Sequence, residues 1–171
     1  MKRLDRNFFI RDVLEVAPEL LGKILVIKKD GKIERYMITE VEAYRGEEDL
    51  ACHASKGKTR RNEVMYDIGG KIYVYLIYGM YWMLNFVTGE KDKPQAALIR
   101  SIEGFDGPGK LTKHLKIDKS FYGEDLTTSK RIWVEENINK NNFEIMSLPR
   151  VGIDYAGEYW KNVPWRFLLK K

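Results

Sequence analysis

The chain has 171 residues, a length that suits one domain with a substantial buried core. Hydrophobic residues make up 44 % of the sequence and the mean hydropathy is −0.44, values that exclude a disordered chain and indicate a soluble globular protein. A net charge of +5 and a pI of about 9.1 are compatible with a nucleic-acid partner, although many basic proteins bind nothing anionic.

Membrane insertion, secretion and disulfide formation are not indicated by the sequence. No apolar run reaches the roughly 18 residues that a membrane span needs, and no apolar region follows the basic start at 1–6, so we expect no signal peptide. The single cysteine, Cys52, excludes an internal disulfide and a zinc site built from several cysteines. A reducing cytoplasm is therefore the simplest expected location.

The first predicted elements are helical and then extended. Residues 5–21 have helical apolar spacing, and we expect Pro18 to divide them into two short helices. Strands are expected over 23–29 and 33–44, joined at 30–31 by Asp-Gly, which is a strong signal for a two-residue hairpin. Strict alternation predicts that the second strand presents one shared face made of Tyr36, Ile38, Glu40, Glu42 and Tyr44.

The middle of the chain combines a polar loop with an aromatic hairpin. Residues 45–66 read as an irregular loop with at most one helical turn, and strands are expected over 72–77 and 80–88 with a break at Tyr78 and Gly79. Four tyrosines and a tryptophan crowd into 73–85. Such side chains suit stacking on nucleobases, where each stacked base contributes on the order of 1–3 kcal/mol.

The remaining elements complete the predicted fold. A third strand of this region is expected over 95–103 and a helix over 111–117, and the later strands are expected over 131–135, 147–153 and 165–169. No repeat or linker interrupts the sequence. We predict a single α+β domain, 1–171, built on a curved antiparallel sheet with short flanking helices and a protruding hairpin.

Two glutamates and an arginine could carry acid–base chemistry. Glu42 lies beside aromatic residues near a strand end and could take a proton from water, although by residue type alone a surface glutamate is the simpler interpretation. Glu40 shares its predicted face, and alternation does not choose between them. Arg100 lies in an apolar strand and needs an acidic partner, for which Glu42 is the natural candidate. A structural salt bridge explains that pair equally well.

The polar loop holds one of the two histidines. His53 could donate a hydrogen bond to a ligand. Together with Cys52 and Glu42 it makes a conceivable metal site, but the spacing matches no metal-ligand pattern and adjacent ligands are awkward, so we predict no metal.

Tyrosines of the hairpin region could act on a base. Tyr78 would protrude from the hairpin tip, where an intercalating wedge is one use for an exposed ring. A ring folded back over the hairpin is the alternative. Tyr75 and Tyr44 could enclose an extruded base, and ordinary cross-strand packing is the alternative for them.

These residues lie in segments that resemble the alkyladenine (3-methyladenine) DNA glycosylase family, the mammalian type rather than the helix-hairpin-helix type. The resemblance runs from about residue 20 to residue 167. It is most specific in the tyrosine-rich hairpin and in the Glu-Ala-Tyr strand. The matching segments are 42–44, 49–55, 60–62, Met65, 73–81, Asn85, 98–100, 107–111, 149–153 and 165–167.

The resemblance implies a base-excision repair enzyme that flips alkylated or deaminated purine nucleotides out of duplex DNA and hydrolyses the N-glycosidic bond. It implies that Glu42 is the general base, and that Arg100 and the backbone carbonyl of Val151 help to hold the attacking water. The other implied roles are a base pocket lined by Tyr44, His53 and Tyr75, a pocket floor at Leu98, an obstacle to the purine 2-amino group at Asn85, and a wedge in the duplex at Tyr78.

Two positions depart from the family pattern. Trp82 stands where the family has smaller or phenylalanine-like residues, and Asp154-Tyr155 stands where it has Gly-His. We expect these differences to affect the shape of the pocket and the substrate range rather than the reaction class. The short amino-terminal region fits a compact bacterial member of the family.

We therefore predict a monofunctional DNA glycosylase that acts as a monomer on double-stranded DNA containing damaged purines, without metal, organic cofactor, membrane or obligate protein partner. The alternative is a non-catalytic nucleic-acid-binding domain that uses the hairpin as a stacking wedge. A carboxylate paired with Arg100 disfavours it, because a negative charge would repel a phosphate-rich ligand. A small-molecule hydrolase is disfavoured by the basic loop and by the lack of a nucleophile motif. The preferred lesion stays open.

Overall fold

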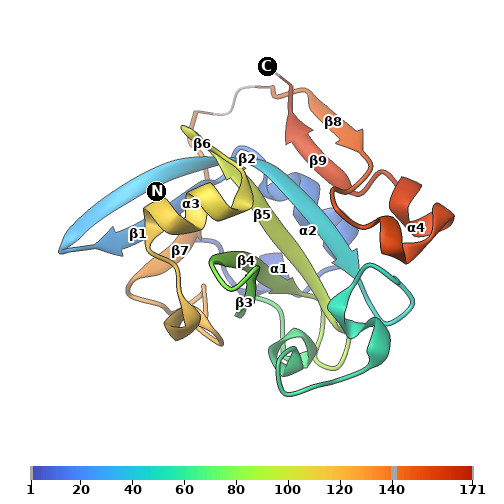
Figure 1. Cartoon of the computed structure of the whole chain (residues 1–171). Coiled ribbons are helices and arrows are strands. Elements are labelled where there is room, and N and C mark those ends of the chain that lie inside the picture. Colours follow the sequence, from blue (N-terminus) through green and yellow to red (C-terminus); the bar gives the residue numbers. More distant parts are fainter. Residues whose placement is uncertain (1, 140–141, 171) are drawn as a thin grey trace.

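One antiparallel sheet organises the computed structural model, which describes residues 2–139 and 142–170 (Figure 1). Its main path runs β3-β4-β5-β2-β1-β7, while β6 pairs with β5, and β9 pairs with both β2 and β8. The strands are β1 (Ile24–Lys29), β2 (Lys32–Arg45), β3 (Ile72–Ile77), β4 (Tyr81–Thr88), β5 (Gln95–Ile102), β6 (Phe105–Asp106), β7 (Ile132–Glu135), β8 (Ile145–Leu148) and β9 (Arg166–Leu169). The predicted α+β fold with an antiparallel sheet is confirmed.

Short helices flank this sheet in the described part of the chain. They are α1 (Arg6–Phe9), α2 (Val13–Leu20), α3 (Pro108–Leu115) and α4 (Glu158–Asn162), with single 3-10 turns at η1 (His53–Lys56), η2 (Glu63–Tyr66), η3 (Lys119–Phe121) and η4 (Asp154–Ala156). None of the helices among these residues has the length and hydrophobicity that a membrane span requires.

The helix break predicted at Pro18 is wrong. Pro18 lies inside α2, and the chain breaks earlier, before Asp12, whose side chain accepts a hydrogen bond from the amide of Leu14 and caps the helix. Proline removes only one backbone donor from α2, which buries Val13, Val16 and other apolar residues against the sheet. That packing outweighs the lost hydrogen bond.

Two tight hairpins agree with the sequence. Asp30 and Gly31 have φ values of 52° and 76°, the left-handed pair that a two-residue turn of this type needs. Tyr78 and Gly79 also have positive φ values, 53° and 65°, but they belong to a three-residue loop between the paired residues Ile77 and Tyr81. Asparagine, aspartate and glycine adopt such φ values readily, whereas an aromatic residue does so at a cost.

The pairing of β2 with β5 contains an irregularity that the sequence did not reveal. The register passes from Ile38↔Ile102 to Glu40↔Ser101 and then to Val41↔Ile99, so that Thr39 and Arg100 have no directly opposed partner. The alternation of β2 is thereby inverted: Ile38 lies in the main core, and so do Val41 and Ala43. The prediction of one face shared from Tyr36 to Tyr44 is therefore wrong.

The inverted segment separates two hydrophobic clusters. The main core packs α1, α2 and α3 against the sheet and contains residues such as Phe9, Leu20, Ile38 and Ile99. A second cluster forms where the loop after β2 folds over the other side of β3, β4 and β5, and it contains Cys52, Ala54, Val64, Met65, Tyr66, Tyr73, Val87 and Ala96. The side chains of Glu42 and Tyr44 therefore lie on the face of the sheet that this loop covers, opposite the main core.

The carboxyl-terminal part differs most from the prediction. β8 spans Ile145–Leu148, and residues 151–153 are irregular rather than the end of a strand over 147–153. The short β6 and α4 were not predicted. Figure 1 shows β8, β9 and α4, in orange to red, on one side of β2, with α4 beside the loop that follows β2. This arrangement brings the 150–155 segment to the end of β2.

Candidate active site

A cavity of about 430 Å³ lies between the loop after β2, the β3–β4 hairpin, β5 and the 150–155 segment. It brings together eight of the nine residues predicted for the site: Tyr44, His53, Tyr75, Tyr78, Asn85, Leu98, Arg100 and Val151. The ninth, Glu42, is fully buried directly behind Tyr44, Arg100 and Val151. The predicted grouping therefore exists, with the carboxylate in the wall rather than on the surface of the cavity.

The strand register explains how the floor of this cavity forms. Leu98 of β5 is paired with Glu42 of β2 on one side and with Asn85 of β4 on the other. Asn85 is in turn paired with Tyr73 of β3. Directly paired residues on neighbouring strands lie side by side on one face of a sheet, so these four form a row, and Leu98, Asn85 and Tyr73 of that row line the cavity.

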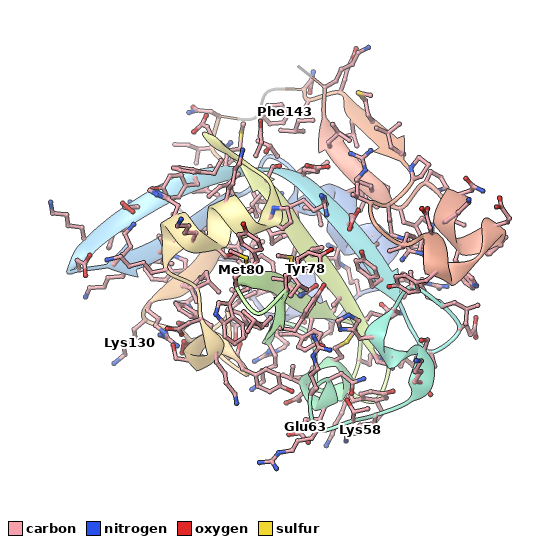
Figure 2. All side chains as sticks on the ribbon, viewed as in Figure 1. Lys58, Glu63, Tyr78, Met80, Lys130 and Phe143 are labelled. Atoms are coloured by element: carbon pink, nitrogen blue, oxygen red, sulfur yellow. The ribbon has the colours of Figure 1, made fainter. Side chains whose placement is uncertain are left out.

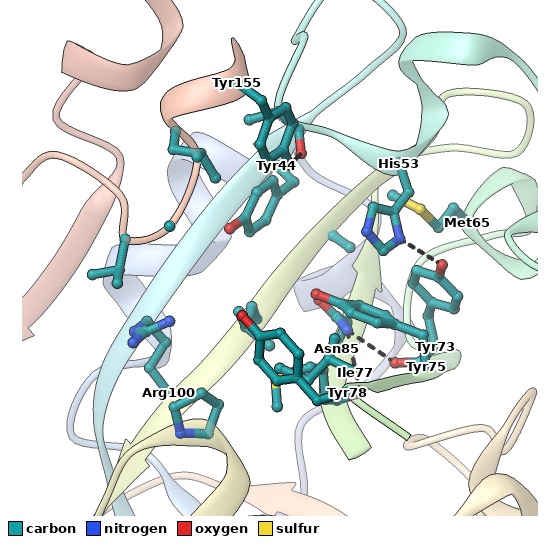
Figure 3. Close-up of a pocket in the computed structure, with 18 residues that line it drawn as sticks. Tyr44, His53, Met65, Tyr73, Tyr75, Ile77, Tyr78, Asn85, Arg100 and Tyr155 are labelled. Carbon is teal, nitrogen blue, oxygen red and sulfur yellow. Dashed lines mark hydrogen bonds between the residues drawn. The ribbon is translucent and has the colours of Figure 1, made fainter. Parts of the chain in front are cut away.

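Aromatic rings form the walls. The ring centroids of His53 and Tyr75 are 4.3 Å apart with an interplanar angle of 58°, and Figure 3 shows Tyr44 across the cavity from them. His53 Nδ1 and the hydroxyl of Tyr73 are hydrogen-bonded at 2.8 Å, which fixes the imidazole ring. A flat ligand can therefore lie between Tyr44 on one side and His53 with Tyr75 on the other.

His53 is held in its neutral form. Burial, together with the positive charge of Arg61, lowers the pKa of His53 to about 4. The imidazole consequently carries no charge near neutral pH. A neutral ring tolerates a positively charged ligand, which an imidazolium would repel.

Glu42 has a specific set of partners. Its Oε1 accepts a hydrogen bond of 2.8 Å from the Tyr44 hydroxyl, and its Oε2 accepts one of 2.7 Å from the amide of Val151. Arg100 Nη1 lies 3.6 Å from Oε1, an ion pair without a hydrogen bond. Burial raises the pKa of Glu42, and Arg100, the Val151 amide, Tyr44 and Arg150 act in the opposite direction.

The contact made by Val151 differs from the expected one. The residue was expected to act through its carbonyl on a water, and the contact in this structure is its amide donating to Glu42. The role of the carbonyl stays a prediction. The interaction of Glu42 with Arg100, expected from the sequence, is present.

Glu40 and Glu42 are distinguished by their surroundings. Glu40 accepts hydrogen bonds of 2.9 Å from Ser101 Oγ and from Arg166 Nη1, neither of which lines the cavity. Arg100 lies between the two carboxylates, since its Nε is 3.6 Å from Glu40 Oε2, and this Nε has no hydrogen-bond partner among the described residues. Glu40 is therefore part of a structural salt bridge, whereas Glu42 is bonded to two residues that line the cavity, Tyr44 and Val151.

Asn85 lines the cavity and also ties two strands together. Its Nδ2 donates to the carbonyl oxygens of Tyr73 at 3.2 Å and Met83 at 3.4 Å. The side chain is buried. Both interpretations of this residue, as an obstacle to a base and as a strand tether, thus have a structural basis.

Tyr78 is exposed at the hairpin tip as predicted. Its side chain is 87 % exposed, and Figure 2 shows it beside Met80 at the tip of the β3–β4 hairpin. The ring is not folded back over the hairpin. An exposed tyrosine at the rim of an aromatic cavity can enter a stacked duplex.

The two departures from the family pattern lie in different places. Trp82 packs against the main core on the opposite face of β4, so it does not shape the cavity as expected. Tyr155 does line the cavity at its mouth, and its hydroxyl donates to the carbonyl of Ala51 at 3.3 Å. Met65 and Tyr73 also line it, and nothing in the alternation of the sequence separated them from ordinary core residues.

A metal has no evident place here. Within residues 2–139 and 142–170, no group of three or more histidine, cysteine, aspartate and glutamate side chains could hold a metal ion. Burial raises the pKa of the Cys52 thiol to about 12, so the thiol is protonated near neutral pH.

Comparison with known proteins identifies the class of protein that this fold and site define. Residues 7–107 and 104–171 match the family described as methylpurine-DNA glycosylase. The match covers almost the entire sequence, so the chain belongs to the methylpurine-DNA glycosylase family.

Curated relatives agree with this assignment. The chain is 40 % identical to a protein of Natranaerobius thermophilus, 44 % identical to one of Borrelia garinii subsp. bavariensis and 44 % identical to one of Legionella pneumophila. The matches cover 98–99 % of this chain and 96 % of each relative. Each relative is named "Putative 3-methyladenine DNA glycosylase". The predicted family is confirmed, and so is the prediction of an enzyme rather than a non-catalytic binding domain.

Proposed function

We propose that this enzyme removes damaged purines from duplex DNA, holding the extruded base in the aromatic cavity and hydrolysing its N-glycosidic bond with a water activated by Glu42. The observation that carries the proposal is the buried carboxylate of Glu42, whose pKa is raised by burial, in the wall of a cavity lined by Tyr44, His53 and Tyr75. Its family and the names of its relatives make it a monofunctional DNA-3-methyladenine glycosylase of base-excision repair.

The carboxylate is prepared to act as a base. Each Glu42 oxygen accepts one hydrogen bond from the protein, from Tyr44 or from Val151, and an ionised carboxylate oxygen can accept a second. A water bound there gives its proton to Glu42 while its oxygen forms a bond to the sugar C1′. The N-glycosidic bond breaks, and its electron pair leaves with the base. A carboxylate with a raised pKa is a better proton acceptor for this step.

The cavity suits a purine made cationic by alkylation. The faces of Tyr44 and Tyr75 attract a cation, and burial keeps their hydroxyls protonated by raising their pKa values. His53 is neutral and does not repel the ligand. The cationic base leaves as a neutral purine, which explains why no strong general acid is needed opposite Glu42.

The surroundings of the cavity suit double-stranded DNA. Tyr78 would fill the space that the extruded nucleotide leaves in the duplex, which costs least to open where the damaged base is weakly paired. The bacterial relatives support an enzyme that works in the cytoplasm on chromosomal DNA, and nothing in the proposed reaction requires a second protein.

The test compares two matched substitutions, Glu42→Gln and Glu40→Gln. Duplexes containing 3-methyladenine, 7-methylguanine, hypoxanthine or ethenoadenine are incubated with excess enzyme, and abasic sites are cleaved with alkali. Glu42→Gln should keep duplex binding and lose excision, because the amide cannot take a proton from water. Glu40→Gln should excise at nearly the parental rate. Excision of hypoxanthine by Glu42→Gln at the parental rate would refute the general-base role.

A further inference from the structure

An ion pair with no role in the proposed reaction lies buried beneath the cavity. Arg150 and Asp49 are both fully buried, and the guanidinium binds the carboxylate through two hydrogen bonds of 2.6 Å and 3.0 Å. Taking two charges out of water costs free energy that their attraction seldom exceeds. A gain in stability therefore explains this buried ion pair poorly, and its contacts indicate a different role.

Arg150 contacts the wall of the cavity from behind. Its guanidinium carbon lies 4.9 Å from the ring centroid of Tyr44 and 5.1 Å from that of Trp165, so it lies between two aromatic rings. Its Nη1 also donates to the carbonyl of Ala43 at 2.9 Å. One cation thus contacts both the Tyr44 ring and the backbone carbonyl of the residue before it.

The neighbours of Arg150 in sequence link it to Glu42. Val151 follows Arg150 directly and donates its amide to Glu42, while Ala43, which accepts from Arg150, follows Glu42 directly. Two adjacent residues of one segment therefore hold two adjacent residues of the other. A shift of the guanidinium would move the Val151 amide relative to the carboxylate.

Asp49 extends the same restraint to the opposite wall. Its carboxylate oxygens also accept hydrogen bonds of 3.0 Å from the amides of Arg45 and Ala51. These bonds fix the turn that leads from β2 into η1, where His53 lies. One ion pair thus contacts the segments that carry Val151, Tyr44 and His53.

We infer that the Arg150–Asp49 ion pair positions the reacting groups: it holds the Val151 amide on Glu42 and the Tyr44 ring in the cavity wall, and thereby sets the rate of base excision without touching the substrate. This inference rests on the function proposed above. It names Arg150 and Asp49 as positioning residues, and it assigns them an effect on the chemical step rather than on DNA affinity.

The charge of Arg150 adds a second, separable effect. It lowers the pKa of Glu42 against the opposing effect of burial. The other groups that interact with Glu42 are Tyr44 on β2, Tyr75 on β3, Tyr155 of η4, the Val151 amide and Arg100 on β5, which also contacts Glu40. Removal of the Arg150 charge should raise the pKa of Glu42 further, so the acid limb of the excision rate should move to higher pH.

The experiment uses the full chain and a hypoxanthine duplex under single-turnover conditions. The double variant Arg150→Met with Asp49→Asn removes both charges together, and asparagine still accepts one backbone hydrogen bond. Its excision rate should fall about 10- to 100-fold, since a misplacement of about 1 Å costs a factor of this order. Its affinity for the duplex should stay close to the parental value, and its acid limb should move to higher pH.

A second variant separates geometry from charge and covers the case in which the double variant does not fold. Arg150→Lys keeps the positive charge but loses the planar guanidinium that donates two hydrogen bonds to Asp49. It should lower the excision rate while leaving the acid limb in place. If Arg150→Lys excised at the parental rate, the paired hydrogen bonds to Asp49 would not be needed, and the positioning role would be wrong.

The control is an ion pair elsewhere, between Arg6 of α1 and Asp125. The double variant Arg6→Met with Asp125→Asn should excise at the parental rate even if it melts earlier. A parental rate and pH profile in the Arg150/Asp49 double variant would overturn the inference and leave the proposed function intact. If the parental enzyme excised none of the four lesions, the proposed function would fall, and the inference with it.

Discussion

Two carboxylates of one strand show how surroundings decide chemistry at the scale of single residues. Glu40 and Glu42 lie two positions apart on β2, and Arg100 lies within 3.6 Å of both. Glu40 is engaged by Ser101 and Arg166, whereas Glu42 is fully buried and has its pKa raised. Burial costs free energy in the ionised form, and that cost is what prepares Glu42 to accept a proton.

The same cost predicts a pH-dependent gain in stability for Glu42→Gln. The folded-state pKa of Glu42 lies above its ordinary value of 4.5, so its contribution to stability is full below that value and is lost as pH rises through the raised pKa. Glutamine does not titrate. The melting temperature of Glu42→Gln minus that of the parent should therefore increase between about pH 5 and about pH 8. An equal difference at both pH values would contradict the buried, ionised carboxylate.

His53 predicts the opposite dependence. Its folded-state pKa of about 4 lies below the ordinary value of 6.5, so stability is lost as pH falls from about 6.5 to about 4. The loss is of the order of 3 kcal/mol, because each unit of pKa corresponds to about 1.4 kcal/mol. Urea unfolding across this range should show a shallower decline for His53→Gln than for the parent. Parallel declines would show that His53 is not held neutral.

Asn85→Ser tests an obstacle to guanine. Asn85 lines the cavity, and a purine 2-amino group placed against it would lose water without gaining a partner, at a cost of roughly 1–3 kcal/mol. The smaller serine should raise guanine excision relative to hypoxanthine, most clearly opposite thymine. Loss of the bonds to Tyr73 and Met83 should also lower the melting temperature. If the melting temperature fell while the ratio of guanine to hypoxanthine excision stayed the same, Asn85 would act only as a tether between strands.

At the scale of elements, the β3–β4 hairpin contains a strained turn. Tyr78 has a φ of 53°, a left-handed conformation that costs a residue with a side chain roughly 1–2 kcal/mol. The Asp30–Gly31 turn adopts a similar geometry with a residue that tolerates it better. We propose that this strain is retained because the exposed ring is used outside the protein, as the wedge in the duplex.

Tyr78→Asn should therefore stabilise the hairpin while impairing function. Asparagine tolerates the left-handed conformation, and an 87 % exposed ring loses few contacts when removed. We expect an equal or higher melting temperature together with a smaller ratio of lesion-duplex to undamaged-duplex affinity. Tyr159→Asn, which replaces a 68 % exposed tyrosine of α4, serves as the control and should leave that ratio unchanged. If Tyr78→Asn left the ratio of lesion-duplex to undamaged-duplex affinity unchanged, Tyr78 would not act as a wedge in the duplex.

Sequence patterns predicted the elements whose cause is local. The Asp30-Gly31 turn and the alternation in β3 and β4 depend on neighbouring residues, and both hairpins occur where expected. The position of α2 depends on the packing of Val13 and Val16 against the sheet, which outweighs Pro18. The irregularity at Thr39 and Arg100 depends on two strands at once, so no pattern within either strand could reveal it.

The candidate site was predicted by resemblance more than by local pattern. The bond between Val151 and Glu42 joins residues 109 positions apart, and the Arg150–Asp49 pair joins residues 101 positions apart. Neither separation leaves a periodic signal. The sequence marks Arg150 only as part of a segment that matches the family, and its contacts with Asp49, Ala43 and Tyr44 depend on the folded structure.

For the whole molecule, the net charge of +5 predicts how salt acts. Contacts with DNA phosphates release counterions regardless of sequence, so affinities for damaged and undamaged duplexes should fall in parallel as salt rises from about 50 to about 200 mM. The single-turnover rate at saturating enzyme should change little, because Glu42 is buried away from mobile ions. If the single-turnover rate fell with salt as steeply as the affinity does, salt would be acting on the chemical step itself, which would contradict this prediction.

The distance along the chain between Glu42 and Val151 also affects when a newly made molecule becomes active. During synthesis, Glu42 leaves the ribosome long before the segment that contains Arg150 and Val151 exists. Until that segment folds back onto β2, the carboxylate lacks the amide that holds it and the cation that holds Tyr44. Under the proposed mechanism, an unfinished chain carries the tyrosine hairpin without a held carboxylate, so translation that ends prematurely releases no fragment able to excise bases.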